Sequence, residues 1–286
     1  MKPELIADYQ CITGENPLWH PIENRLYWLD IPNGRLFRYN PKTGEHENFY
    51  THSEEVGSFT FQPDGSLLLF MSRGAIAIWH DGELTPIIDE IEDERESRFN
   101  DVIADPVGRV FCGTMPQESR LGKLYRLDLD GSITEILNGI TCSNGLGFTP
   151  NLKSLYYTDS MKHQIYLFDY DQETGSISNQ QVFVTTPKNE GVPDGMTVDA
   201  EGYIWSARWD GNCLVRFDPS GKEERRIEFP AKKVSSLTFG GDDLTDIYVT
   251  TAGGDNKPEE GAGAGALFRL NLGIQGAAEF SSQIDV

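Results

Sequence analysis

Carboxylate and carboxamide side chains recur at one position of a repeated pattern in this 286-residue sequence. Six segments align on an apolar or small residue, at Trp19, Phe61, Ala104, Phe148, Val198 and Phe239. The residues four places earlier are Glu15, Gly57, Asn100, Asn144, Asp194 and Ser235. Carboxylate and amide oxygens suit hard divalent cations, whereas thiolate and imidazole ligands suit softer metals. If these positions converge in the fold, the four oxygen-bearing side chains predict a divalent-cation site.

The same residue types also have a purely structural explanation. Asn, Asp and Gly are common at strand entries, because they tolerate turn conformations and bond free backbone amides. For any one of these residues alone, the turn explanation is sufficient. Four such residues in one register favour the cation site, because a turn or strand entry does not require the glutamate found at position 15 (Glu15).

Other reactive residue types form no recognisable catalytic motif. The sequence has no G-x-S-x-G, and its five histidines share no position in the repeat and show no metal-binding spacing. The four cysteines are widely spaced, without a C-x-x-C pair or a histidine at zinc-ligand spacing. We therefore expect reduced thiols in or beside strands, and no serine or cysteine nucleophile.

Three further segments bear on the candidate site. The acidic run DEIEDERES (89–97) indicates a solvated loop, and Arg98 directly follows it. Arg98 can pair with a neighbouring acid or contact a substrate. The segment PQESRL (116–121) lengthens a loop on the same face and places Glu118 near the opening. The glycine-rich segment 253–266 lacks the strand–loop–helix context of a phosphate-binding loop and predicts a mobile loop.

Short apolar strands recur along the whole chain and supply the elements that would position these residues. The segments NRLYWLD, GSLLLFM, GRVFCGT, KSLYYTD, GYIWSAR and TDIYVTT follow one another at steps of 41 to 49 residues. Each is preceded and followed by another strand-like segment, and further apolar stretches fill the gaps. Each unit of about 45 residues therefore contains four short strands.

Six four-stranded units in radial array are the blades of a β-propeller. We predict an all-β fold, a six-bladed β-propeller of four-stranded antiparallel blades, forming one domain over residues 1–286. The unpaired N-terminal segment ELIADYQ is expected to be the outermost strand of the last blade, which closes the ring. A solenoid is the alternative, and the absence of polar caps counts against it. Because the first strand of each propeller blade lines the central channel, the aligned positions would converge there.

The composition excludes several classes of partner. The chain has 24 Lys and Arg against 45 Asp and Glu, a net charge of −21. This charge argues against nucleic acids and anionic membranes, both of which attract basic residues. No apolar run approaches the roughly 18 residues of a membrane span. The start MKPELIADYQ has no apolar signal region, so we expect a cytoplasmic protein, and the sequence favours no particular oligomeric state.

Motifs spread from about residue 13 to 272 match a known family in order and spacing. They include GENPLW, NRLYWLDI, RFND, SNGLGF, PDGMTVDAEGYIW and YVTTA. Together they resemble the senescence marker protein/regucalcin/gluconolactonase family. This resemblance implies a six-bladed propeller and a divalent-metal-dependent lactonase that acts on a sugar lactone.

The resemblance also implies roles for individual residues. The implied metal ligands are Glu15, Asn144 and Asp194. Asn100 is placed beside the metal, reached directly or through substrate or water, and Arg98 and Glu118 would contact sugar hydroxyls. The expected cofactor is one divalent ion. Oxygen ligands favour Ca²⁺, while Zn²⁺, Mn²⁺, Mg²⁺ and Fe²⁺ are alternatives.

The resemblance, together with the aligned oxygen donors, implies hydrolysis of an aldono-lactone, such as glucono- or xylono-lactone, to the aldonic acid. The metal would polarise the carbonyl, and Asp194 would assist the attack of water. A metal-dependent phosphoester or organophosphate hydrolase is an alternative that would require apolar walls and more carboxylates. A non-catalytic calcium-binding propeller is another. The polar residues Arg98, Asn100 and Glu118 favour the sugar lactone.

Overall fold

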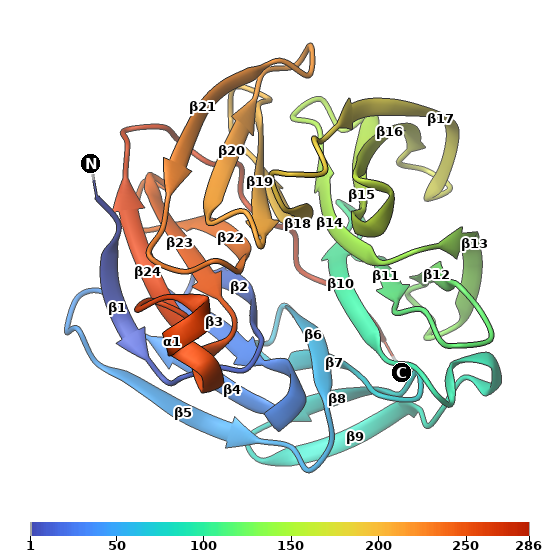
Figure 1. Ribbon diagram of the computed structural model, residues 1–286. Helices are drawn as coiled ribbons and strands as arrows, with labels where there is room; N and C mark the ends of the chain where they lie inside the picture. The colour runs from blue at the N-terminus through green and yellow to red at the C-terminus, as the bar shows by residue number, and fades with distance from the viewer. Residues whose placement is uncertain (1, 286) are drawn as a thin grey trace.

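The computed structural model describes residues 2–285, and within them six four-stranded antiparallel sheets are arranged around a central axis (Figure 1). In five sheets the strands pair in chain order, so each of these blades is a simple meander. The predicted six-bladed β-propeller is confirmed.

The blades follow one another along the chain, and each begins with its innermost strand. Blade 1 contains β2 (Gly14–His20), β3 (Arg25–Asp30), β4 (Arg35–Tyr39) and β5 (His46–Thr51), and blade 2 contains β6 (Val56–Phe61), β7 (Leu67–Met71), β8 (Ile76–His80) and β9 (Glu83–Ile88). Blade 3 contains β10 (Phe99–Ala104), β11 (Val110–Thr114), β12 (Gly122–Leu127) and β13 (Ile133–Ile140), and blade 4 contains β14 (Ser143–Phe148), β15 (Ser154–Asp159), β16 (Gln164–Asp171) and β17 (Ser176–Thr185). Blade 5 contains β18 (Val192–Val198), β19 (Ile204–Trp209), β20 (Cys213–Phe217) and β21 (Glu223–Glu228), and blade 6 contains β22 (Val234–Gly240), β23 (Asp246–Thr251) and β24 (Ala266–Asn271).

Blade 6 takes its fourth strand from the other end of the chain. The N-terminal strand β1 (Glu4–Asp8) pairs antiparallel with β24, with Asp8 opposite Ala266, and in Figure 1 the blue β1 lies beside the orange-red β24. This confirms the predicted ring closure. Backbone groups at the edge of β24 are thereby paired within the chain and are not left as a free sheet edge.

Glycine-containing turns connect the strands where the sequence predicts them. Gly65, in the PDG turn between β6 and β7, has a φ of 86°, and Gly131, between β12 and β13, has a φ of 77°. Residues with a β-carbon rarely adopt this left-handed conformation, so glycine supplies it at little steric cost. Local turn chemistry therefore sets the length of these hairpins.

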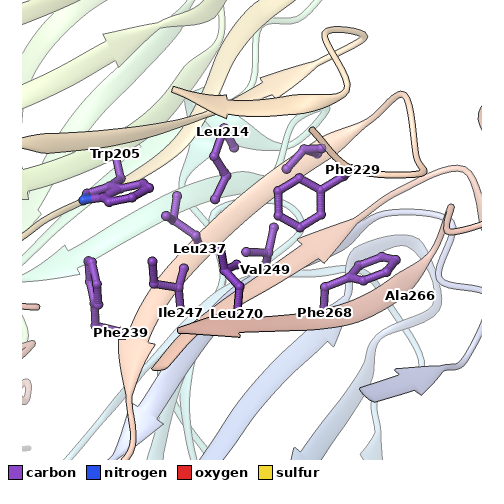
Figure 2. Close-up of a cluster of buried hydrophobic side chains, with 12 residues drawn as sticks. Trp205, Leu214, Phe229, Leu237, Phe239, Ile247, Val249, Ala266, Phe268 and Leu270 are labelled. Carbon is purple, nitrogen blue, oxygen red and sulfur yellow. The ribbon is translucent and has the colours of Figure 1, made fainter. Parts of the chain in front are cut away.

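The core consists of apolar layers between neighbouring blades. Figure 2 shows the layer between blades 5 and 6, where Trp205 and Leu214 of blade 5 face Leu237 and Phe239 of the inner strand β22. The layer continues outward along blade 6 to Phe268. Alternate residues of each strand point to the same face of its sheet, so every blade contributes side chains to two such layers.

Helical structure is minor within residues 2–285. It comprises α1 (Lys257–Glu260) and four short 3-10 turns, one of which is η4 (Gly254–Asn256). The glycine-rich segment 253–266 contains these two helical turns, and an ion pair joins Glu260 to Lys233, the residue before β22. The mobility expected of this segment stays a prediction. None of these helices is long and apolar enough to cross a membrane.

After β24 the chain crosses the end of the axis where the inner strands finish. The amide of Ala277 donates to the carbonyl of Val198, the last residue of β18, and the amide of Ser282 donates to that of Phe61, the last residue of β6. This C-terminal segment occupies one end of the propeller. The opposite end, where the inner strands begin, holds the cavity described next.

Candidate active site

A cavity of about 260 Å³ lies at the end of the axis where the inner strands begin. Its polar lining includes Glu15, Arg98, Asn100, Asn144, Ser160 and Asp194. Its apolar lining includes Met115, Met161, Val192 and Trp209, and Thr13 and Cys142 complete the wall. Five of the six residues singled out from the sequence thus share one cavity.

The aligned positions occupy equivalent places on the inner strands. Glu15, Asn100 and Asn144 are the second residues of β2, β10 and β14, and Asp194 is the third residue of β18. The pairing register with the second strand shifts close to each of these positions, for example between Glu15 and Leu18 in blade 1. Bulges of this kind bend a strand and redirect side chains, and they are common beside functional sites.

The two remaining aligned positions hold small residues that pack between neighbouring blades. A β-carbon on Gly57 would lie 2.0 Å from the carbonyl oxygen of Phe99, so no side chain fits there. The hydroxyl of Ser235 is buried and donates to the carbonyl oxygen of Gly14 at 2.5 Å. These contacts join blade 2 to blade 3 and blade 6 to blade 1, which explains why only four of the six positions carry oxygen donors into the cavity.

The cavity concentrates negative charge in a buried setting. Glu15 is 4% exposed and Asp194 is 5% exposed. Burial raises the pKa of both carboxyls well above their ordinary values, and repulsion from neighbouring carboxylates raises it further. Burial also raises the pKa of Asp101 to about 7, and this carboxyl acts on both of the others. The guanidinium of Arg98 is the cation that opposes them.

Asp101 was not identified from the sequence, although it follows Asn100 in the RFND motif. Its side chain lines a second, smaller cavity of about 50 Å³ on the axis, together with Glu279 from the C-terminal segment. Asp101 lies one residue outside the register in which the oxygen donors recur, so the repeat does not point to it. Its charge nevertheless contributes to the electrostatics of the first cavity.

A chain of hydrogen bonds orients the amide side chains. Nη1 of Arg98 donates to Oδ1 of Asn100 at 2.6 Å, and Nδ2 of Asn100 donates to Oδ1 of Asn144 at 2.8 Å. Nδ2 of Asn144 in turn donates to Oγ of Ser160 at 2.8 Å. This chain keeps the Asn144 oxygen on the side of Asn100 and leaves it a second lone pair for a further partner.

The donor set of the cavity fits a divalent cation. Glu15 and Asp194 line the cavity with the Arg98 guanidinium, and the nearby Asp101 adds a third carboxylate, which leaves a formal excess of two negative charges when all four groups are ionised. Within residues 2–285 no group of three or more His, Cys, Asp or Glu side chains is arranged to hold a metal. The candidate set is mixed, with two carboxylates and the Asn144 carboxamide, and such oxygen ligands suit Ca²⁺, Mg²⁺ or Mn²⁺.

Glu118 does not line the cavity. It is an exposed residue in the loop between β11 and β12, three positions after the cavity residue Met115. The structure therefore brings together the sequence-predicted residues except this one.

The apolar wall was also missed by sequence reasoning. Met115 follows β11, Met161 follows β15 and Trp209 ends β19, so all three lie at the ends of second strands. In an antiparallel pair, the end of the second strand lies beside the start of the first. This topological rule could have located these residues, because the aligned donors sit at the start of the first strands. Cys142, one of four free cysteines, precedes β14 at the same end.

Comparison with known proteins identifies the family. Pentonolactonase XacC of Haloferax volcanii is 47% identical over 289 residues, covering 98% of this chain and 97% of that protein. Homo sapiens regucalcin is 32% identical over 294 residues, covering 98% of each chain. A solved structure of a luciferin-regenerating enzyme superposes with a TM-score of 0.89 at 28% identity, covering 99% of this chain and all of the other.

The sequence pattern described as the SMP-30/Gluconolactonase/LRE-like region matches residues 13–253. This match spans most of the chain, and the motifs that suggested the resemblance lie mainly within it. The chain belongs to the SMP-30/gluconolactonase/LRE-like family.

Proposed function

We propose that this chain hydrolyses the ester bond of a sugar lactone in the cavity described above and releases the aldonic acid. The observation that carries the proposal is the convergence of Glu15, Asn144 and Asp194 with Arg98 in one cavity of about 260 Å³. The relative at 47% identity is a pentonolactonase, so five-carbon aldono-lactones such as xylono-lactone are the first substrates to test, followed by glucono-lactone.

Glu15, Asn144 and Asp194 would hold one divalent cation, for which Ca²⁺ fits the oxygen donors best. When bound, such a cation supplies Lewis acidity toward the lactone carbonyl. The buried Asp194 carboxylate would accept a proton from the attacking water. A carboxylate that binds a cation is a weak base, so the cation would also have to lower the pKa of that water. Asn100 orients Arg98 through the hydrogen bond to its guanidinium, and the remaining Arg98 donors bind substrate hydroxyls.

The test is acid release at constant pH from a panel of aldono-lactones, with spontaneous hydrolysis subtracted. We expect turnover that a chelator abolishes and that one divalent ion restores. The ion that restores activity would identify the cofactor, and the fastest lactone would identify the substrate. Absence of turnover with every ion, in protein that binds metal tightly, would contradict the proposal.

A second candidate function is hydrolysis of an organophosphate or another phosphoester. The observation that favours it is that four apolar side chains, Met115, Met161, Val192 and Trp209, line the same cavity as the polar donors. A polyhydroxylated lactone uses such a wall only through the apolar face of its ring, whereas an aryl phosphotriester would fill it. Paraoxon in the same assay separates the two, and faster turnover of paraoxon than of any lactone would favour this alternative.

Arg98→Ala is expected to raise KM for hydroxylated lactones by about 10- to 100-fold, because a hydrogen bond to a charged group contributes about 1.5–3 kcal/mol. The kcat should change less, since Arg98 is assigned to substrate binding and not to proton transfer. Steady-state kinetics measure the split. Arg95→Ala is the matched control, because Arg95 is exposed and pairs with Glu90 at 2.6 Å outside the cavity. An unchanged KM in Arg98→Ala would remove Arg98 from the binding site.

A further inference from the structure

The acidic run 89–97 contributes a fully buried carboxylate to blade 3. After β9, the 3-10 turn η2 (Glu92–Glu94) places Glu94 at 0% exposure. Its Oε1 accepts a hydrogen bond from the Tyr125 hydroxyl at 2.8 Å, and its Oε2 lies 2.7 Å from Nη2 of Arg120. The prediction of a solvated loop is therefore wrong for Glu94. A buried carboxylate requires partners, and two residues from outside the acidic run supply them.

Arg120 belongs to the loop that carries Glu118. We call residues 115–121 the rim loop, because it connects the cavity residue Met115 to β12. The amide of Gln117 donates to the carbonyl of Arg120 at 2.7 Å, so these two residues close a turn with Glu118 at its tip. The side chains of both closing residues donate to the carbonyl of Asp93 in η2, at 2.9 Å from Gln117 and 2.7 Å from Arg120.

The two segments are also joined where they reach the cavity. The amide of Met115 donates to the carbonyl of Arg98 at 3.0 Å, and the hydroxyl of Ser97 donates to the carbonyl of Met115 at 2.7 Å. Arg98 and Met115 both line the cavity. The rim loop is thus hydrogen-bonded to the acidic run at its base and again at its turn. The tip residue Glu118 is exposed and lies three positions after the cavity residue Met115.

We propose that Glu94 and Arg120 are positioning residues that hold the rim loop in place, so that Glu118 at its tip binds the outer hydroxyls of the substrate. This inference rests on the proposed lactone hydrolysis. The Glu94–Arg120 ion pair has a fully buried member, so removing Arg120 leaves a buried carboxylate with one partner fewer and releases one closing residue of the turn. The pair therefore acts on substrate binding through the position of Glu118 and not through contact with the substrate.

The first test compares Arg120→Ala, Arg120→Lys and the control Arg95→Ala in otherwise intact protein. We expect Arg120→Ala to raise KM for xylono-lactone about 10-fold with kcat within about threefold of the parent, because misplacing a binding group weakens substrate binding. Arg120→Lys should recover part of this loss, since it restores the charge without the forked geometry. Arg95→Ala removes an exposed ion pair from the same acidic run and should change neither constant. A fall in kcat as large as the rise in KM, or a KM in Arg120→Lys as high as in Arg120→Ala, would overturn the assignment.

A double-mutant cycle tests whether Arg120 acts through Glu118. If it does, Glu118→Ala raises KM, and adding Arg120→Ala to it changes KM by no more than about twofold. The proposal would be overturned if the rise in KM of the double variant equalled the product of the rises in the two single variants. An unchanged KM in Glu118→Ala would overturn it as well. Hydrogen exchange of residues 115–121 supplies a readout independent of turnover. Exchange should be faster in Arg120→Ala than in Arg95→Ala, and equal protection would contradict the proposal even in a protein that hydrolyses no lactone.

Discussion

Replacing Asp194 by alanine is expected to abolish lactone hydrolysis, with kcat lowered about 10³-fold or more. A general base alone contributes about 10²–10⁴-fold, and this residue is also assigned as a metal ligand. Asp194 is 5% exposed and is one of the two carboxylates that line the cavity, so its replacement removes half of that carboxylate pair. Steady-state kinetics measure the loss of turnover, and calorimetric titration with Ca²⁺ measures the accompanying loss of affinity.

Asp194→Asn separates the two roles of this residue. The carboxamide retains an oxygen donor and nearly the same volume, but it cannot accept a proton from water. We expect measurable residual affinity for the metal and almost no turnover. Asp210→Asn is the control, because Asp210 is an exposed carboxylate in the same blade, next to the cavity residue Trp209. Full activity in Asp194→Ala would remove Asp194 from the mechanism.

Saturating Ca²⁺ is expected to raise the melting temperature by about 5–10 °C at pH 8 and by much less at pH 5. A ligand at 100 times its Kd stabilises a protein by about 2.7 kcal/mol, and each kcal/mol corresponds to about 2–4 °C in a chain of this size. The pH dependence arises because the carboxyls must lose their protons before they bind the cation. Scanning calorimetry at the two pH values measures both shifts.

The direction of this dependence follows from the raised pKa values of Glu15 and Asp194, and of Asp101 at about 7. In the unfolded chain, carboxyls titrate near about pH 4. Between that pH and the raised pKa values of the folded state, the folded protein therefore holds more protons than the unfolded chain. The free energy of unfolding of the metal-free protein therefore falls as pH rises through this window.

Bound metal is expected to offset this loss of stability at high pH. NaCl at the same ionic strength is the control, because added salt also screens the repulsion between the carboxylates. The double variant Glu15→Gln, Asp194→Asn should lose most of the Ca²⁺ effect at pH 8. A Ca²⁺ shift of equal size at pH 5 and pH 8 would contradict the assignment of these carboxyls as ligands.

The sequence by itself determined the propeller, its closure and the register of the donors. Strand length and turn position depend on residues close together in the chain, such as the PDG turn that ends in Gly65. Because the same order of strands and turns recurs in six units, these local signals predict the fold of the whole chain. The segment Glu4–Asp8 had no partner nearby in sequence, which predicted its pairing with the last blade. Equivalent positions of equivalent strands then placed Glu15, Asn100, Asn144 and Asp194 in one cavity.

Only the tertiary structure decided which side chains are buried and which partners they meet. Gly57 and Ser235 occupy the donor register but pack against neighbouring blades, which no spacing within a unit could reveal. Glu94 lies in a run of acidic residues typical of a solvated loop, yet Arg120 and Tyr125, some 26 and 31 residues further on, bury and neutralise it. The period of strands and turns is a local property of the sequence, so it could be predicted. The burial and the partners of a charged side chain depend on groups that are distant in sequence, so they could not.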